Sequence, residues 1–468
     1  HMYKNIYLLE SFWGNMKTLS LAFLSCLISL FFLPTESQAP PYEPLGTNHS
    51  LLWTAKIGNA SFRTNICNKK GFIVIGSNGD YFRDGYHFDR KSGVYLINSS
   101  SGNIRCSIDN DKWGDFDVNG TIFFNNKIFY GNDNEEFICV DQSGNIIWKN
   151  LASGDVEAEP VLIDIKGKKA IVYATELGEV KAVDPESGRS LWAYYTPEFT
   201  GWREGENRLV FKVKAFFSGT SSFFIKPVLA DVNKDAVLDL IYSSIPGEVI
   251  CLNGSNGSLL WKFNMEGVSF SYFLDAKLVQ QKNEFWISSS SYDTKTEKSY
   301  LFITRISEKG KLLGKIEVLN SGEGSFALNS LSLGSSGHLY ATQDSVFIVE
   351  NKKVKESFYI GDTFRVKSYW DSEERIVYRN YHDQIFGSGL LKYKGIDSCF
   401  ILLSQYDRAN YKNSFISVIS IKDKKVIGRF SLPASGELPP QIGDFNGDGV
   451  NELLVNCSDG KLYCYQLN

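Results

Sequence analysis

The chain has 468 residues, of which 40 are Gly and 14% are aromatic, while only five are His. This composition favours a large all-β protein, and the chain is long enough to bury a continuous core. The formal net charge of −4 gives no electrostatic reason to expect nucleic acid as a partner.

The N-terminal segment has the features of an export signal. Residues 19–33 form an apolar run, and residues 37–39 read Ser-Gln-Ala, a small-x-small cleavage pattern. We therefore expect residues 1–39 to be an extension with an export signal and residues 40–48 to be a linker. The protein is then periplasmic, cell-surface or secreted. A membrane attachment stays open, either through an uncleaved apolar run or through lipidation at Cys26.

An eleven-residue pattern returns along the chain. Its best copy reads Ala182-x-Asp184-x3-Gly188-x3-Trp192, and three further clear copies cover residues 96–106, 139–148 and 251–261. Looser copies without the Trp end near residues 314, 355 and 428. Repeats of roughly 40 residues that each contain several short strands are typical of propeller blades.

Each unit contains four short apolar runs separated by turn residues. In the best unit these runs cover residues 160–163, 170–174, 180–183 and 190–194. Four strands joined by tight turns form one antiparallel sheet. No stretch after the export signal shows a convincing helical period. The sequence therefore predicts an all-β fold, a β-propeller of four-stranded antiparallel blades.

The two ends of the repeat region complement each other. Cys464 occupies the first position of the pattern, but the sequence stops before its Trp, whereas residues 49–53 supply a strand and Trp53 without preceding strands. We expect the last blade to pair one N-terminal strand with three C-terminal strands, which leaves no free sheet edge. Residues 49–468 are thus predicted to form a single propeller domain of eight blades, or of seven if the copy near residue 355 is spurious.

On these residues the chain resembles the pyrroloquinoline-quinone-like (PQQ-like), or quinoprotein-type, propeller family, whose blades carry the motif Ala-x-Asp-x3-Gly-Lys-x2-Trp. Residues 182–192 match this motif with Arg189 in place of Lys, and the resemblance covers residues 49–468. The small first residue leaves room for an indole, so Trp148, Trp192 and Trp261 are expected to stack between blades. Many quinone-dependent members have two adjacent cysteines against the cofactor. This chain has no Cys-Cys dipeptide, and we do not expect PQQ as a cofactor.

Two loops place oxygen-bearing residues at alternating positions, a spacing that suits a structural calcium ion. The candidate ligands in the first loop are Asp444, Asn446, Asp448, Val450 through its carbonyl, and Glu452. The candidate ligands in the second loop are Asp231, Asn233, Asp235, Val237 through its carbonyl, and Asp239. Both loops resemble the calcium loops of FG-GAP-type propeller repeats, although the second has Ala at the turn and an inserted Lys. The alternative for each loop is an Asx-type turn without metal.

A set of mixed charge precedes the predicted first strands, which line the axis of a propeller. We expect these residues at the mouth of the channel: Arg63, Asp117, Glu157, Glu159, Lys226 and Glu437. The longest connection, residues 196–222, carries Trp202 and Arg203. Such residues suit a protein or glycan contact, or else Trp202 packs the insertion onto the ring.

The sequence contains no nucleophile elbow, no Ser-His-Asp order and no Gly-rich phosphate loop, so no catalytic residues are assigned. The first hypothesis is an exported, non-catalytic propeller that serves as a protein-binding or assembly scaffold. One alternative is a divergent PQQ-dependent dehydrogenase, and another is a glycan-binding propeller.

Overall fold

The computed structural model describes strands and turns, and no helix occurs in the residues that it describes. These residues are 49–61, 63–69, 71–79, 91–109, 116–197, 199, 223, 225–244, 247–265, 275–279, 284–293, 298–321, 330–333, 337–341, 345–360, 363–367, 374–378, 383–405, 414–434, 436 and 438–467. The predicted export signal and linker therefore lie outside the described part. Within that part, no helix is long and apolar enough to cross a membrane.

The chain divides into two compact units. One comprises residues 1–39 and 363–377, and its described part consists of β26 (Thr363–Lys367) and residues 374–377 of β27 (Glu374–Tyr378), which together form a two-stranded sheet. The other comprises residues 40–362 and 378–468 and contains all the remaining strands. This second unit carries the repeats and the candidate sites.

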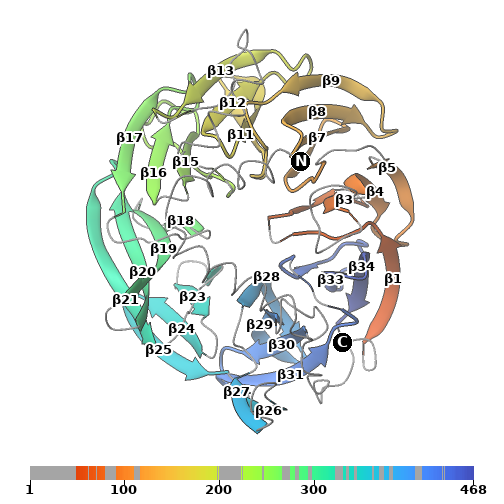
Figure 1. The fold of residues 1–468 in the computed structure, drawn as a ribbon, viewed down its shortest axis with the longest axis vertical. Coiled ribbons are helices and arrows are strands. Elements are labelled where there is room, and N and C mark those ends of the chain that lie inside the picture. Colours follow the sequence, from red (N-terminus) through yellow and green to blue (C-terminus); the bar gives the residue numbers. More distant parts are fainter. Residues whose placement is uncertain are drawn as a thin grey trace, which may run out of the picture. The chain divides into compact units, whose positions relative to one another are not determined.

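Eight four-stranded antiparallel sheets form the blades of a β-propeller in the larger unit (Figure 1). The first four blades follow the chain and contain these strands: β2 (Ile66–Lys69), β3 (Phe72–Asn78), β4 (Ser92–Asn98) and β5 (Ile104–Asp109) in blade 1; β6 (Thr121–Phe124), β7 (Lys127–Asn132), β8 (Glu136–Asp141) and β9 (Ile146–Leu151) in blade 2; β10 (Val161–Ile165), β11 (Lys168–Ala174), β12 (Glu179–Val183) and β13 (Ser190–Tyr195) in blade 3; and β14 (Val228–Ala230), β15 (Asp239–Ser243), β16 (Glu248–Leu252) and β17 (Leu259–Asn264) in blade 4.

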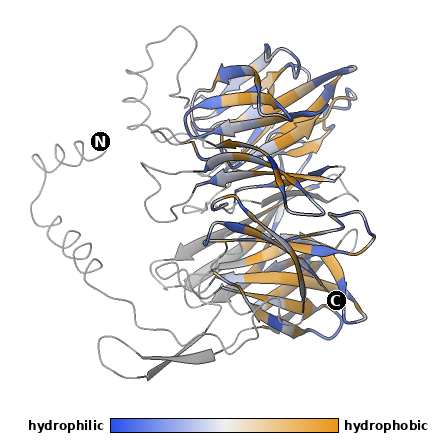
Figure 2. Ribbon diagram, turned by 90° about the vertical axis from the view of Figure 1, so that its right-hand side faces the viewer, coloured by the Kyte–Doolittle hydropathy of each residue, from blue (hydrophilic) through white to orange (hydrophobic). Residues whose placement is uncertain are grey.

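The other four blades contain these strands: β18 (Asp275–Val279), β19 (Glu284–Asp293), β20 (Lys298–Ser307) and β21 (Leu312–Ser321) in blade 5; β22 (Ser330–Ser332), β23 (His338–Ala341), β24 (Ser345–Glu350) and β25 (Lys353–Tyr359) in blade 6; β28 (Asp383–Tyr393), β29 (Ile396–Gln405), β30 (Phe415–Ser420) and β31 (Lys425–Ser431) in blade 7; and β32 (Gln441–Gly443), β33 (Glu452–Cys457), β34 (Lys461–Gln466) and β1 (Ser50–Lys56) in blade 8. The prediction of eight blades is confirmed, and the copy near residue 355 is the outer strand of blade 6. Hydrophobic residues lie mainly in the strands and hydrophilic residues mainly in the turns (Figure 2).

The eleven-residue pattern is the hairpin of the third and fourth strands of a blade. Its first and last positions are cross-strand partners, as in Ala182 with Trp192 and Cys251 with Trp261. The register shifts directly after Ala182 and Cys251, and a bulge of this kind bends the strand. Cys139, which the sequence placed at the same small position, is also completely buried.

Each Trp of the pattern packs against the motif Gly of the next blade. A Cβ atom built on Gly188 of blade 3 would lie 2.6 Å from Cδ2 of Trp148 in blade 2. The φ angle of Gly188 is +69°, so both the backbone and the indole require Gly here. The indole N–H of Trp148 donates to the carbonyl of Pro185 at 3.1 Å. The motif Gly of one blade is thus the docking surface for its neighbour, a role that the sequence analysis did not assign.

The first and last parts of the described chain meet in blade 8. Strand β1 pairs antiparallel with β34, and Trp53 is the cross-strand partner of Cys464 (Figure 1). The indole of Trp53 then packs on Gly102 of blade 1 and donates to the carbonyl of Ser99 at 2.8 Å. The predicted closure by strands from the two ends of the chain is confirmed. The same Trp–Gly contact that links other blades also links the last blade to the first.

The contacts between blades 5, 6 and 7, where the Trp is absent, include ion pairs. Glu284 of blade 5 pairs with Arg305 of its own blade at 2.8 Å and with Lys352 of blade 6 at 3.0 Å. Lys424 of blade 7 pairs with Glu356 of blade 6. Charged contacts thus connect these blades, which lack the Trp of the pattern, together with other packing contacts such as Trp286 against His338.

Candidate functional site

Polar residues from three blades meet where the first strands begin, and we refer to them as the mouth cluster: Ser61, Arg63, Asn119 and Glu157. Arg63 precedes β2, Asn119 precedes β6 and Glu157 precedes β10. The guanidinium of Arg63 forms an ion pair with one carboxylate oxygen of Glu157. Asn119 donates to the other oxygen at 2.6 Å and accepts from the hydroxyl of Ser61. The Glu157 side chain is only 8% exposed, so these partners offset the cost of burying its charge.

The other predicted residues of the mouth form separate contacts. Lys226 of blade 4 forms an ion pair with Glu159, which precedes β10 of blade 3. The side chain of Lys226 is 52% exposed. The carbonyl of Asp117 accepts from the backbone N–H of Asp133, in the turn after β7. Three further candidates, Glu437, Trp202 and Arg203, lie outside the described residues.

The carboxyl of Glu176 belongs to the same region, although the sequence analysis did not select it. Its backbone N–H donates to the carbonyl of Asp155 at 3.0 Å. Burial, reinforced by the negative charge of Glu157, raises the pKa of Glu176 to about 7, while the charge of Arg63 opposes the shift. A carboxyl with such a pKa changes its charge near neutral pH. The only sequence signal was an acidic residue in the turn between the second and third strands.

A cavity of about 300 Å³ lies between blades 1 and 2. Cys106 takes the place of the docking Trp at this interface, with Gly144 of blade 2 against its sulfur. The ion pair between Lys149 and Glu136, 2.8 Å long, forms part of the lining. Asn132 donates to the same carboxylate at 3.2 Å, so the acidic group at this wall is already partnered.

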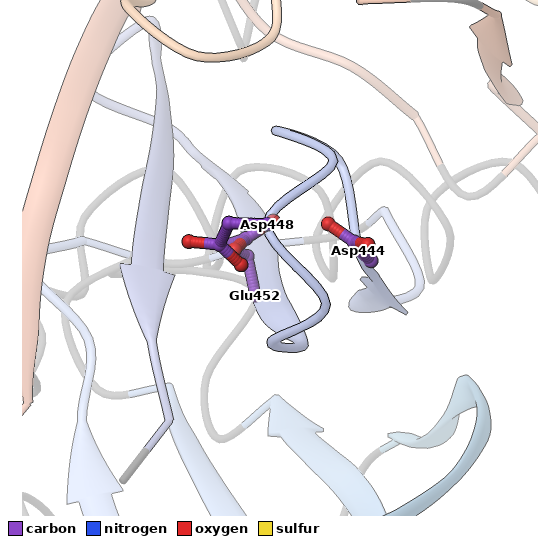
Figure 3. A group of neighbouring side chains, drawn as sticks. All are labelled: Asp444, Asp448 and Glu452. Carbon is purple, nitrogen blue, oxygen red and sulfur yellow. The ribbon is translucent and has the colours of Figure 1, made fainter.

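The loop from residue 444 to 452 brings three carboxylates together. Oxygens of Asp444, Asp448 and Glu452 lie within 4.8 Å of one another. Figure 3 shows Asp448 and Glu452 close together, with Asp444 on the neighbouring arm of the loop. The loop backbone curls around these groups, because Asp444 accepts from the N–H of Gly447 at 2.7 Å and from that of Gly449 at 2.9 Å.

The remaining predicted ligands shape this loop. The amide oxygen of Asn446 accepts from the N–H of Asp448, and Asp448 in turn accepts from the N–H of Val450, each at 2.8 Å. One oxygen of Glu452 accepts from the N–H of Phe445 at 2.7 Å. The other, Oε1, is buried and has no hydrogen-bond partner. Burial raises the pKa of Glu452, and the neighbouring carboxylates of Asp448 and Asp444 add to the shift.

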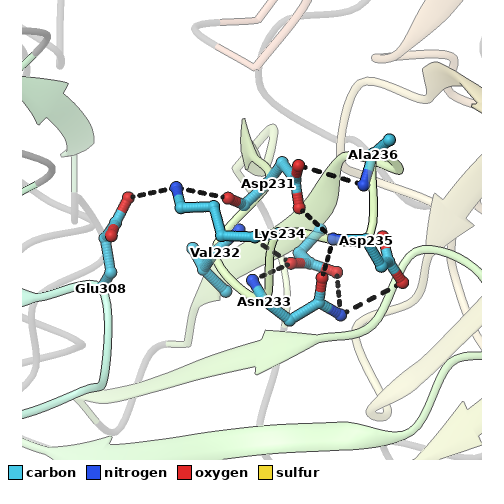
Figure 4. Close-up of polar contacts among 8 residues, drawn as sticks. Asp231, Val232, Asn233, Lys234, Asp235, Ala236 and Glu308 are labelled. Atoms are coloured by element: carbon cyan, nitrogen blue, oxygen red, sulfur yellow. Dashed lines mark hydrogen bonds and ion pairs between the residues drawn. The ribbon is translucent and has the colours of Figure 1, made fainter.

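The loop from residue 231 to 239 has nearly the same hydrogen bonds. Asp231 accepts from two loop N–H groups, and Asp235 accepts from the N–H of Val237 at 2.9 Å. Asp239 accepts from the N–H groups of residues 232 and 233. In addition, the ammonium of Lys234 reaches across this loop to a neighbouring blade (Figure 4). All-oxygen ligand sets of this kind suit calcium.

The comparisons with known proteins agree with the fold. The family model described as outer membrane protein assembly factor BamB matches residues 90–206. Quinohemoprotein alcohol dehydrogenase ADHIIG from Pseudomonas putida HK5 has a TM-score of 0.53 at 12% identity, covering 91% of this chain and 78% of that chain. The Dos1 propeller has a TM-score of 0.55 at 11% identity, covering 90% of this chain and 95% of that chain. Saccharomyces cerevisiae Sqt1 has a TM-score of 0.56 at 9% identity, covering 90% of this chain and 100% of that chain.

At these identities the solved structures show a shared propeller fold and nothing about activity. The family match and the eight blades together support a PQQ-like propeller. No curated protein sequence matches the chain significantly.

Proposed function

We propose that the protein is an exported, non-catalytic propeller that binds a protein partner through the mouth of blades 1–4 and acts as an assembly scaffold. The observation that carries this proposal is the mouth cluster, in which the buried pair of Arg63 and Glu157 fixes charged groups from different blades. The match of residues 90–206 to the BamB family model also supports it. Rigid elements that present charged groups at loop ends are a common way to build a recognition surface.

The charges of this region favour a partner with basic residues. Arg63 and Lys226 face an excess of carboxylates, which includes Glu157, Glu159 and Glu176. Opposite charges across an interface steer association and select the partner. Because Glu176 ionises near neutral pH, binding of a basic segment should strengthen as the pH rises from about 6 to 8.

Site-specific photo-crosslinking in the native host tests the proposal. A photoreactive residue at position 226 lies at the mouth, and a matched residue at position 169 lies at the opposite end of blade 3, at the start of β11. Both lysines are about half exposed, at 52% and 47%. We expect a discrete crosslinked partner from position 226 only. Equal labelling from both positions, or none from position 226, would contradict the proposed face.

Two alternatives predict different outcomes. A divergent quinone-dependent dehydrogenase would take up one equivalent of the quinone with its absorbance band and turn over an alcohol or sugar. A glycan-binding propeller would retain defined glycans on an array. Either result would replace the scaffold proposal, since neither follows from a mouth that binds protein.

A further inference from the structure

Related loops join the first and second strands of blades 3, 4 and 8, and two of them contain a cation of their own. In blade 3 the ammonium of Lys169 pairs with Asp164 at 2.8 Å. In blade 4 the ammonium of Lys234 donates to the carbonyl of Asp231 at 2.8 Å and pairs with Glu308 of blade 5 at 3.2 Å. A lysine ammonium therefore lies at both loops, paired with the loop carboxylate Asp164 in blade 3 and with Glu308 of the next blade in blade 4.

The loop of blade 8 has no such lysine. Gly447 occupies the position of Lys234, as the aligned sequences Asp-Phe-Asn-Gly-Asp and Asp-Val-Asn-Lys-Asp show. Within the described part of the chain, no Lys or Arg pairs with the three acidic residues of this loop, Asp444, Asp448 and Glu452. Oxygens of three carboxylates thus lie within 4.8 Å of one another without a paired Lys or Arg among the described residues. Such close negative charges are electrostatically unfavourable.

The chain topology explains a second difference between blades 4 and 8. In blade 4 the turn between β16 and β17 lies beside the loop, and the N–H of Gly254 donates to Oδ1 of Asp239 at 3.1 Å. Ser255 of the same turn donates to Asp235 at 3.2 Å. In blade 8 the corresponding strands are β34 and β1, which are far apart in sequence and are not joined by a turn.

Glu452 shows the effect of the turn that blade 8 does not have. Its residue is completely buried, yet Oε1 has no hydrogen-bond partner, whereas the equivalent oxygen of Asp239 has the Gly254 N–H. A buried carboxylate oxygen without a partner is costly. The unmet oxygen belongs to the same carboxyl group that lies within reach of Asp444 and Asp448.

We propose that the 444–452 loop binds one divalent cation of the calcium class, and that this ion replaces both the lysine and the turn found in blade 4. Carboxylate oxygens are the donors that calcium prefers. The ion would neutralise Asp444 and Asp448 and supply the missing partner of Glu452. The loop of residues 231–239 already has Lys234 and the turn, so it binds no ion with comparable affinity.

The position of this loop connects the ion to the closure of the ring. Glu452 holds the backbone N–H of Phe445 at 2.7 Å. The Phe445 side chain, only 7% exposed, packs in one cluster with Trp53 of β1 and Ile73 of blade 1. An ion that fixes Glu452 therefore stabilises the seam at which blade 8 meets blade 1.

Isothermal titration with Ca²⁺ of the full chain, stripped of metal, tests the proposal. We expect one site in the wild type, with a dissociation constant between about 10⁻⁵ and 10⁻³ M. Asp448→Asn should weaken binding at least tenfold, whereas Asp235→Asn, the same change in the lysine-bearing loop, should leave it unchanged. Saturating Ca²⁺ should raise the melting temperature of the wild type and of Asp235→Asn, but not that of Asp448→Asn. No binding by the wild type, or unchanged binding by Asp448→Asn, would overturn the proposal.

A reciprocal pair of variants keeps the test independent of folding defects. Gly447→Lys installs the internal cation at a position with φ +83° and no atom within 4 Å of a built Cβ, and Lys234 adopts a similar φ of +62°. This variant should fold without Ca²⁺ and lose the calcium-dependent rise in melting temperature. Lys234→Gly should leave the wild-type site intact. A Gly447→Lys protein that still binds Ca²⁺ with wild-type affinity would contradict the replacement of lysine by metal.

Discussion

Replacement of Trp53 by Ala tests how the ring is held closed. The Trp53 residue is 7% exposed, its ring lies against Gly102 of the next blade, and its N–H donates to the carbonyl of Ser99 at 2.8 Å. Truncation of a buried Trp costs about 3–5 kcal/mol. We therefore expect Trp53→Ala to lower the free energy of unfolding by about that amount and to open the seam between blades 8 and 1.

A matched pair of Phe variants separates packing from hydrogen bonding. Trp261 makes the same contact with the motif Gly of the next blade, Gly310, but its indole N–H has no partner. Trp53→Phe should thus cost about 1 kcal/mol more than Trp261→Phe, the net value of one hydrogen bond. Urea unfolding followed by far-UV circular dichroism, with calcium absent throughout, measures both differences. A loss below about 1 kcal/mol in Trp53→Ala, or equal losses in the two Phe variants, would refute this reasoning.

Three further changes test the charged groups. Arg63→Met leaves the buried carboxylate of Glu157 unpaired and should lower stability by roughly 3 kcal/mol, as measured by urea unfolding. Glu176 has a folded pKa of about 7 and an ordinary value of 4.5, so the folded state binds its proton more tightly, and stability should fall as the pH rises between these values. Glu176→Gln should remove this fall, which parallel unfolding curves at pH 5 and pH 8 would show, and an unchanged pH profile would count against the shift. Glu284→Gln weakens the pairs with Arg305 and a lysine of blade 6 and should lower the melting temperature, whereas no change would show that these ion pairs contribute little.

The fold was predictable because its signal is local. The Trp and Gly of the eleven-residue pattern lie a few positions apart, and Trp148 and Gly188 repeat the same contact from one blade to the next. Blades 5 to 7 gave weaker patterns because they lack the Trp of the pattern, and their contacts include ion pairs such as Lys424 with Glu356. Charged residues on loops and outer strands have no fixed period, so sequence alone does not distinguish such a pair from solvated side chains.

The candidate sites were only partly predictable because their properties depend on distant residues. Arg63 and Glu157 were selected from their positions before first strands, but the pKa of Glu176 depends on burial and on charges from several segments. The two acidic loops look alike in sequence and in backbone. What separates them is Lys234 and the N–H of Gly254, and the latter belongs to a turn that blade 8 does not have.

Hydrogen exchange of β1 and β34 tests most directly whether these two strands close the ring. Strands β1 and β34 pair from Ser50 with Gln466 to Lys56 with Lys461, so peptides from both strands should be protected and should open together. Trp53→Ala should accelerate exchange in both segments while the interior of blade 3 stays protected. Rapid exchange of residues 50–56 in the wild type, with residues 461–466 still protected, would contradict a ring closed by these two strands.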